Sequence, residues 1–127
     1  MDMFYKDVLP YQEKKCILAY NLSLKEKNII KKIVSDKFNF TETDIFTDIL
    51  AVPSVGVFID PSGISESELT CLFEYYIEGH SVERNWVLVF MQPVTTHITL
   101  KESPIYVYKE NNLSKIYEQL CHVADLY

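Results

Sequence analysis

Four polar residues of this sequence are candidates for chemistry, because each directly follows an apolar stretch. They are Asn21, Asp60, Gln92 and Lys109. If the apolar stretches are parallel strands, their carboxyl ends lie along one edge of a sheet, where open α/β sheets bind their ligands. A carboxylate, an amine and two amides at that edge would suit a small charged ligand. The sequence therefore predicts a ligand crevice at the strand ends, lined by these four side chains.

An aspartate and a lysine at neighbouring strand ends resemble, in outline, the phosphoacceptor site of receiver domains. In that family, acidic residues after the first strand hold magnesium, and a serine or threonine follows the strand beside the acceptor. Here Asn21-Leu22 and Gln92 stand at those positions, which leaves too few hard oxygen ligands for a divalent ion. The resemblance thus implies architecture only, and we expect no phosphotransfer, no metal and no cofactor. In the simplest alternative, Asp60 is a turn residue of Asp-Pro-Ser-Gly and Lys109 a solvated loop residue.

Cys71 and Tyr75 form a second candidate site, one turn apart on an expected helix. Both fall opposite the apolar stripe of that helix, and Cys71 lies near Glu74 and Glu78. Neighbouring carboxylates disfavour a thiolate, so a reactive nucleophile is not expected there. An outward cysteine–tyrosine pair suits a protein interface, where aromatic residues are enriched. The alternative is a lone exposed cysteine beside a tyrosine, since single apolar groups are often exposed.

Composition excludes several other functions. The 127 residues hold 12 basic and 18 acidic side chains, for a net charge of −6, so a basic stripe for nucleic acid is not expected. The densest lysines, Lys25 to Lys32, fit the solvated face of one helix. Three widely spaced glycines form no phosphate-binding loop, and three widely spaced cysteines form no zinc or disulfide framework. With no apolar run long enough for a signal peptide or a membrane span, a cytoplasmic protein is expected.

The apolar stretches predict the elements that must position these residues. Residues 16–20, 55–59, 86–91 and 105–108 are short and apolar throughout, which indicates strands buried on both faces. Ser23 with Glu26, and Ser65 with Glu68, form capping boxes that begin two helices. One apolar face of the first helix is expected to contain Ile30, Ile33, Val34 and Phe38. Gly79 is expected to end the second helix, and Asn112 to cap a last one.

Two segments between these elements are harder to assign. Residues 39–54 fit a short strand that leads into a short helix, and residues 94–104 fit an edge strand or a long loop. Strands that are apolar on both faces favour a three-layer α/β sandwich with a mostly parallel sheet of four or five strands, of the flavodoxin or receiver type. The alternative is a ferredoxin-like α+β fold with an extra βα unit. We expect residues 1–14 to be an N-terminal arm and residues 15–127 to form one α/β domain.

These observations lead to two functional hypotheses. The first is a non-enzymatic regulatory module that binds a protein partner or forms a homodimer, because catalytic motifs and phosphate loops are missing while aromatic residues are abundant. The second is a small-ligand-binding or enzymatic domain that uses the strand-end crevice of Asn21, Asp60, Gln92 and Lys109. Binding to nucleic acid or to a membrane is not expected.

Overall fold

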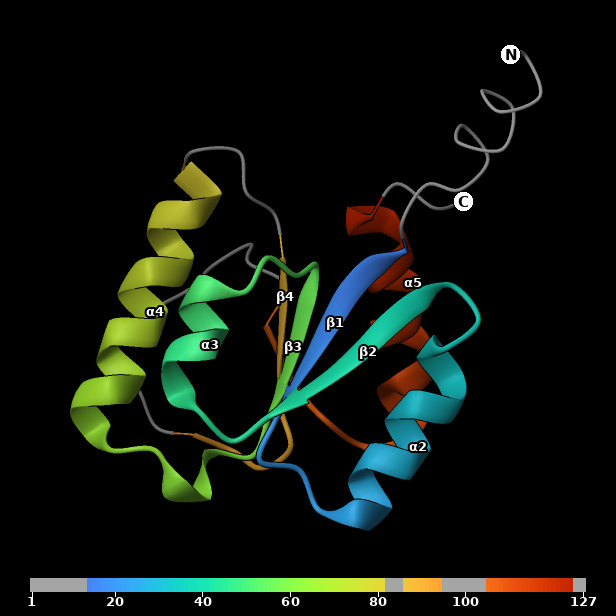
Figure 1. Ribbon diagram of the computed structural model, residues 1–127, viewed down its shortest axis with the longest axis horizontal. Coiled ribbons are helices and arrows are strands. Elements are labelled where there is room, and N and C mark those ends of the chain that lie inside the picture. The colour runs from blue at the N-terminus through green and yellow to red at the C-terminus, as the bar shows by residue number, and fades with distance from the viewer. Residues whose placement is uncertain (1–13, 82–85, 95–104, 125–127) are drawn as a thin grey trace, which may run out of the picture.

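The described part of the chain is built on one five-stranded parallel sheet. The computed structural model describes residues 14–81, 86–94 and 105–124. The strands lie in the order β2-β1-β3-β4-β5 (Figure 1) and are β1 (Lys15–Tyr20), β2 (Phe38–Thr43), β3 (Gly56–Ile59), β4 (Val87–Phe90) and β5 (Ile105–Val107). Every neighbouring pair is parallel. The predicted parallel α/β sandwich is confirmed, and the ferredoxin-like alternative, which needs antiparallel neighbours, is wrong.

Helices cover both faces of this sheet (Figure 1). One face carries α2 (Leu24–Val34) and α5 (Leu113–Val123). The opposite face carries α3 (Phe46–Ala51) and α4 (Glu66–Ser81). Two short 3₁₀ turns, η1 (Pro61–Gly63) and η2 (Glu110–Asn112), follow the ends of β3 and β5. Because the described strands all run in the same direction, the loops that follow them lie at one edge of the sheet.

The central strands are apolar because both of their faces are buried. On β1, Ile17 and Ala19 pack into the cluster under α2 and α5, whereas Leu18 and Tyr20 pack into the cluster under α3 and α4. All four residues of β3, and all four of β4, are buried in the same way. This alternation between two cores explains why the strands appear in the sequence as unbroken apolar runs.

Both predicted capping boxes are present. The Ser23 hydroxyl accepts the Glu26 backbone N–H at 3.2 Å, and the Glu26 carboxylate accepts the Ser23 N–H at 2.9 Å. Ser65 and Glu68 repeat the arrangement at 3.1 and 3.0 Å. Each box pairs two backbone donors that a helix N-terminus otherwise leaves unpaired, and so fixes where α2 and α4 begin.

Four local predictions are wrong. Phe38 is not on the first helix: α2 ends at Val34, and Phe38 is the first residue of β2, where it is buried from the strand. Ile33, expected on the apolar face, is 37% exposed. The helix α4 continues through Gly79 to Ser81, since a single glycine lowers helix stability by only about 1 kcal/mol. Asn112 makes no side-chain cap of α5; its amide instead donates to the Val107 carbonyl at 2.9 Å.

The segment from residue 39 to 54 is a strand followed by a short helix, as predicted. The expected arm, apart from Lys14, and the segment 95–104 lie outside the described residues. Within the described part of the chain, no helix is long and apolar enough to cross a membrane.

Candidate functional site

The four predicted crevice residues lie at the same edge of the sheet. Tyr20 on β1, Ile59 on β3, Phe90 on β4 and Val107 on β5 are aligned in register. Asn21 and Asp60 directly follow the first two of these positions, and Gln92 and Lys109 come two residues after the last two. Parallel strand topology therefore places all four at one edge of the sheet, and their role as a ligand crevice stays a prediction.

Asn21 and Asp60 hold the backbone at this edge. Asn21 has a φ of 57°, the left-handed conformation that asparagine tolerates better than most residues. Its N–H donates to the Thr43 carbonyl at 3.0 Å, which extends the pairing of β1 with β2. The Asp60 carboxylate accepts the Ser62 N–H at 3.0 Å and so caps the 3₁₀ turn η1. Both residues have structural tasks that explain their presence.

The expectation that Asp60 and Lys109 lie at neighbouring strand ends is wrong, and among the described residues the two form no ion pair. Between their strands lies β4, and neighbouring strands are spaced by about 4.8 Å, so the two positions are about 10 Å apart. The Lys109 backbone N–H donates to the Asn112 side chain at 2.9 Å, where the chain turns into η2. Its side chain is exposed, as is that of Gln92. The receiver-like pairing of a lysine with the acceptor aspartate is therefore not formed.

An open hollow of about 370 Å³ lies at this edge on the β1–β2 side of the sheet. It is lined by Ala19, Asn21, Leu22, Lys27, Glu42, Thr43 and Asp44. Of the four predicted residues only Asn21 takes part. The Lys27 ammonium, from α2, lies 2.8 Å from the Glu42 carboxylate, on β2. This pair is half-exposed, so it contributes at most about 1 kcal/mol.

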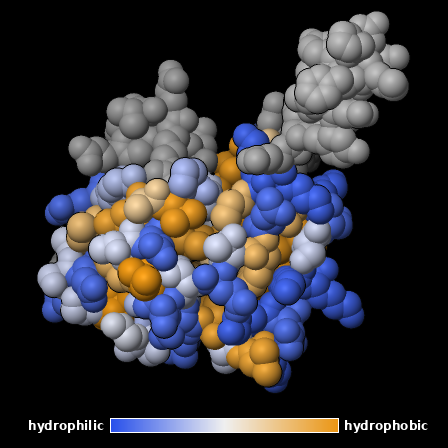
Figure 2. Space-filling model, in the orientation of Figure 1, coloured by the Kyte–Doolittle hydropathy of each residue, from blue (hydrophilic) through white to orange (hydrophobic). Residues whose placement is uncertain are grey.

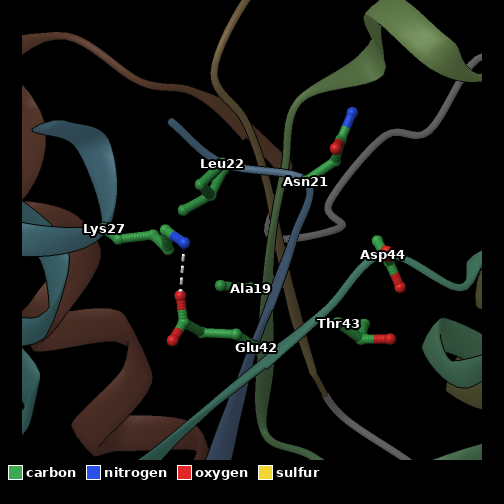
Figure 3. Close-up of a pocket in the computed structure, with 7 residues that line it drawn as sticks. All are labelled: Ala19, Asn21, Leu22, Lys27, Glu42, Thr43 and Asp44. Atoms are coloured by element: carbon green, nitrogen blue, oxygen red, sulfur yellow. Dashed lines mark ion pairs between the residues drawn. The ribbon is translucent and has the colours of Figure 1, made fainter. Parts of the chain in front are cut away.

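The polar groups around the hollow do not converge on one point (Figure 3). Lys27 and Glu42 meet on one side of the β1 backbone, whereas Asp44 lies on the other side and the Asn21 amide points away from all three. Thr43 is also occupied: its hydroxyl donates to Asp48 at 2.6 Å and accepts the Ile45 N–H at 3.0 Å. A catalytic centre requires groups aimed at a common reacting atom, and this arrangement lacks them.

Carboxylates dominate the electrostatics on the α3 and α4 side of the edge. Burial raises the pKa of the Tyr20 phenol, and the nearby charges of Glu68 and Asp44 raise it further. These carboxylates are dispersed, and among the described residues no group of three or more His, Cys, Asp or Glu side chains could hold a metal ion. The α3 and α4 side of the edge thus carries a negative field, and its described residues form no cation-binding cluster.

The second predicted pair is split by the packing of α4. Cys71 is exposed, whereas Tyr75 is half-buried and sets its ring edge-to-face on Trp86, with ring centroids 6.2 Å apart. Part of the Tyr75 surface therefore belongs to the core under α3 and α4. Its role in an interface stays a prediction.

Comparison with known proteins identifies the fold. No protein-family model matches the chain, and no curated protein matches it. Among solved structures, the N-terminal domain of the nisin resistance regulator NsrR, a lantibiotic response regulator, is similar with a TM-score of 0.53 and 12% identity. The match covers 87% of this chain and 98% of that one. The fold is receiver-like. At this identity the similarity concerns the fold alone, in agreement with the 2-1-3-4-5 strand order shared by flavodoxin-like folds.

Four of the residues around the hollow, Lys27, Glu42, Thr43 and Asp44, were not among those predicted from the sequence. Glu42 and Thr43 are the last residues of β2, and Asp44 comes directly after it. The sequence of β2 alternates and is partly polar, so it contains no apolar run that would mark a strand. The fourth projects from α2 and meets β2 only after folding. The sequence indicated the helix through its capping box and a short strand after it. Neither signal shows which strand ends are neighbours in the folded sheet.

Proposed function

We propose that this protein is a non-enzymatic regulatory module that works by binding another protein or itself. The proposal rests on one observation at the edge where the strands end. The fold there is receiver-like, but the polar groups do not point toward a common atom as those of a catalytic centre would. Asn21 and Leu22 follow β1 where a phosphate-accepting receiver needs carboxylates, and Asp60 caps η1. A domain of this kind acts through its surface.

Exposed apolar side chains at the same edge support a protein contact. Leu24, at the start of α2, is 71% exposed, and Ile45, directly before α3, is 55% exposed. Leu24 comes two residues after Leu22, and Ile45 directly follows Asp44, and both Leu22 and Asp44 line the polar hollow. Figure 2 shows apolar surface over α3 and hydrophilic surface over much of α2. Exposed apolar groups with polar groups around their rim are typical of protein contact sites.

Charge indicates the type of partner. Residues 38–81 contain eight acidic side chains and no lysine or arginine: Glu42, Asp44, Asp48, Asp60, Glu66, Glu68, Glu74 and Glu78. This stretch supplies α3, α4 and the ends of β2 and β3. A negative field of this kind attracts a positively charged protein surface and repels phosphate ligands. The partner that fits best is a protein with a basic contact region.

The proposal is tested with the variant Leu24→Ser/Ile45→Ser. Both side chains are exposed, so the melting temperature should stay within about 2 °C of wild type. Proteins from the source cells that bind immobilised wild type should bind the variant at least tenfold less, and high salt should weaken their binding. Thr47→Ser, at an exposed site in the first turn of α3, is the control and should bind as wild type does.

A phosphorylation assay can give the result that would contradict this proposal. Incubation with acetyl phosphate and Mg²⁺ should leave the intact mass unchanged. A gain of one phosphoryl group that is lost in Asp60→Asn would contradict a non-enzymatic module.

A second candidate function is small-ligand binding at the edge, supported by the open hollow and its lysine–glutamate pair. Thermal-shift screening against charged metabolites tests it. Stabilisation that disappears in Asp60→Asn or Lys109→Ala would favour the crevice lined by Asn21, Asp60, Gln92 and Lys109, whereas loss in Lys27→Ala would favour the hollow.

A further inference from the structure

Among the described residues, the strand β2 forms an edge of the sheet and has little of the usual protection against pairing, its one charged residue, Glu42, being paired with Lys27. It is six residues long and, within residues 14–81, 86–94 and 105–124, pairs only with β1, in continuous register from Lys15↔Phe38 to Tyr20↔Thr43 without a bulge. It contains no proline and no lysine. The opposite edge strand, β5, has only three residues. Exposed edges are normally shortened, bulged, or guarded by proline or lysine, because their free backbone groups pair with other chains.

The direction of each backbone group on β2 follows from one hydrogen bond. The Asn21 N–H donates to the Thr43 carbonyl, so Thr43 is directed toward β1. Backbone direction alternates along a strand, and therefore Thr41 and Asn39 also bond to β1. The N–H and C=O groups of Phe38, Phe40 and Glu42 point outward. Among the described residues, no backbone hydrogen bond outside the strands and helices uses these groups.

These three outward residues are symmetric about Phe40, which makes the edge complementary to itself. In an antiparallel pair, Phe40 faces Phe40 of a second copy, and Phe38 faces its Glu42. Each of the three facing pairs exchanges two hydrogen bonds. A shift by two residues in either direction keeps only two facing pairs, so this register is the most favourable one.

The side chains of β2 also tolerate this pairing. Phe40 is half-buried and packs against the core under α2 and α5, so a twofold pair places two aromatic rings side by side. On the other face, exposed Asn39 meets Thr41 of the second copy. The single charged residue of the strand, Glu42, is held 2.8 Å from Lys27, so no unpaired like charges oppose each other within the strands. Figure 1 shows β2 at the front of the sheet, with α2 and α3 to either side of it and neither across it.

We infer that the outer edge of β2 is a homodimer interface, in which two copies join their sheets through antiparallel β2 strands centred on Phe40. The inference deepens the self-association part of the proposed function and rests on it. The contact area of one strand edge is small, so the dimer should be weak and depend on concentration.

Sedimentation velocity of the full chain from about 1 µM to about 1 mM tests the association, because small interfaces dissociate in this range. Glu42→Pro removes an outward N–H without touching the bonds to β1, and should weaken the dimer roughly 30-fold, the equivalent of two hydrogen bonds. Glu42→Gln is the control: it removes the ion pair with Lys27 but keeps the N–H, and should dimerise within about threefold of wild type.

Cysteine pairing tests the register independently of the proline variant. Cys16 lies beside Asn39 in the sheet and contacts Thr41, so the background is Cys16→Ser/Cys71→Ser. In this background, Asn39→Cys mixed with Thr41→Cys should form an intermolecular disulfide under mild oxidation, because facing side chains lie about 5 Å apart. Asn39→Cys alone should cross-link much less.

The outcomes separate this inference from the broader proposal. A dimer that survives Glu42→Pro and gives no mixed cross-link uses another surface, which overturns β2 pairing and preserves self-association. A chain that stays monomeric to about 1 mM overturns both β2 pairing and self-association. A mixed cross-link at these positions supports the pairing even if Glu42→Pro fails to fold.

Discussion

Replacing Gly56 with alanine should weaken the fold, because α5 packs directly against this position of β3. A Cβ built on Gly56 overlaps the Cδ2 atom of Leu120, and the next atom it meets, the Val87 carbonyl oxygen, lies at 3.5 Å. Leu120 is fully buried between α5 and the sheet, so its methyl group cannot move into solvent to make room. The added methyl must therefore displace the helix or force Leu120 into a strained rotamer.

The cost follows from two opposing effects. Overpacking a filled core by one carbon costs about 1–3 kcal/mol. Alanine also loses less backbone freedom than glycine on folding, which offsets about 0.4–1 kcal/mol. The net loss should be about 1–2 kcal/mol. For a chain of this size, each kcal/mol changes the melting temperature by roughly 3–5 °C, so Gly56→Ala should melt roughly 3–10 °C lower.

Thermal unfolding monitored by circular dichroism measures this loss, and Gly63→Ala is the matched control. A Cβ on Gly63 meets only the Asn21 amide nitrogen, at an ordinary 3.7 Å, so that variant should melt at or slightly above wild type. Shortening Leu120 to valine should make Gly56→Ala less costly than in the wild-type background, since the two changes share one space. A Gly56→Ala protein as stable as wild type would refute the close approach of α5 to β3.

Three further results are expected. Asn21→Gly should keep or raise stability, whereas Asn21→Val should lower it by about 1–2 kcal/mol in urea titrations, because the φ of 57° is unfavourable for a β-branched residue. Tyr76→Phe should cost roughly 1 kcal/mol in the same titrations, since it removes the 2.9 Å hydrogen bond from the phenol to the Trp86 carbonyl. Burial and the hydrogen bond to Asp36 raise the pKa of Tyr117 to about 12, so the unfolded chain loses this proton first and stability should fall between about pH 10 and pH 12. A urea midpoint that declines as steeply in Tyr117→Phe as in wild type across that range would contradict this cause.

Much of the fold was predictable because its signals are local. Ser23 and Ser65 fix helix starts through side chains three residues away, and unbroken apolar runs mark strands that need two buried faces. Phe38 was assigned to the wrong element because one aromatic residue at a boundary fits the spacing of apolar residues both in a helix and in a strand. The position of Asn21 was predictable, while its left-handed φ was not, since it depends on where β2 lies.

The sequence by itself determined a three-layer parallel sandwich and the alignment of its strand ends. Only the tertiary structure decided that Asp60 and Lys109 stay apart, that Lys27 meets Glu42, and that β2 lies at an open edge. The physical reason is the range of the interactions. Capping and burial depend on residues a few positions apart, whereas strand order and edge exposure depend on contacts between segments that meet only in the folded chain.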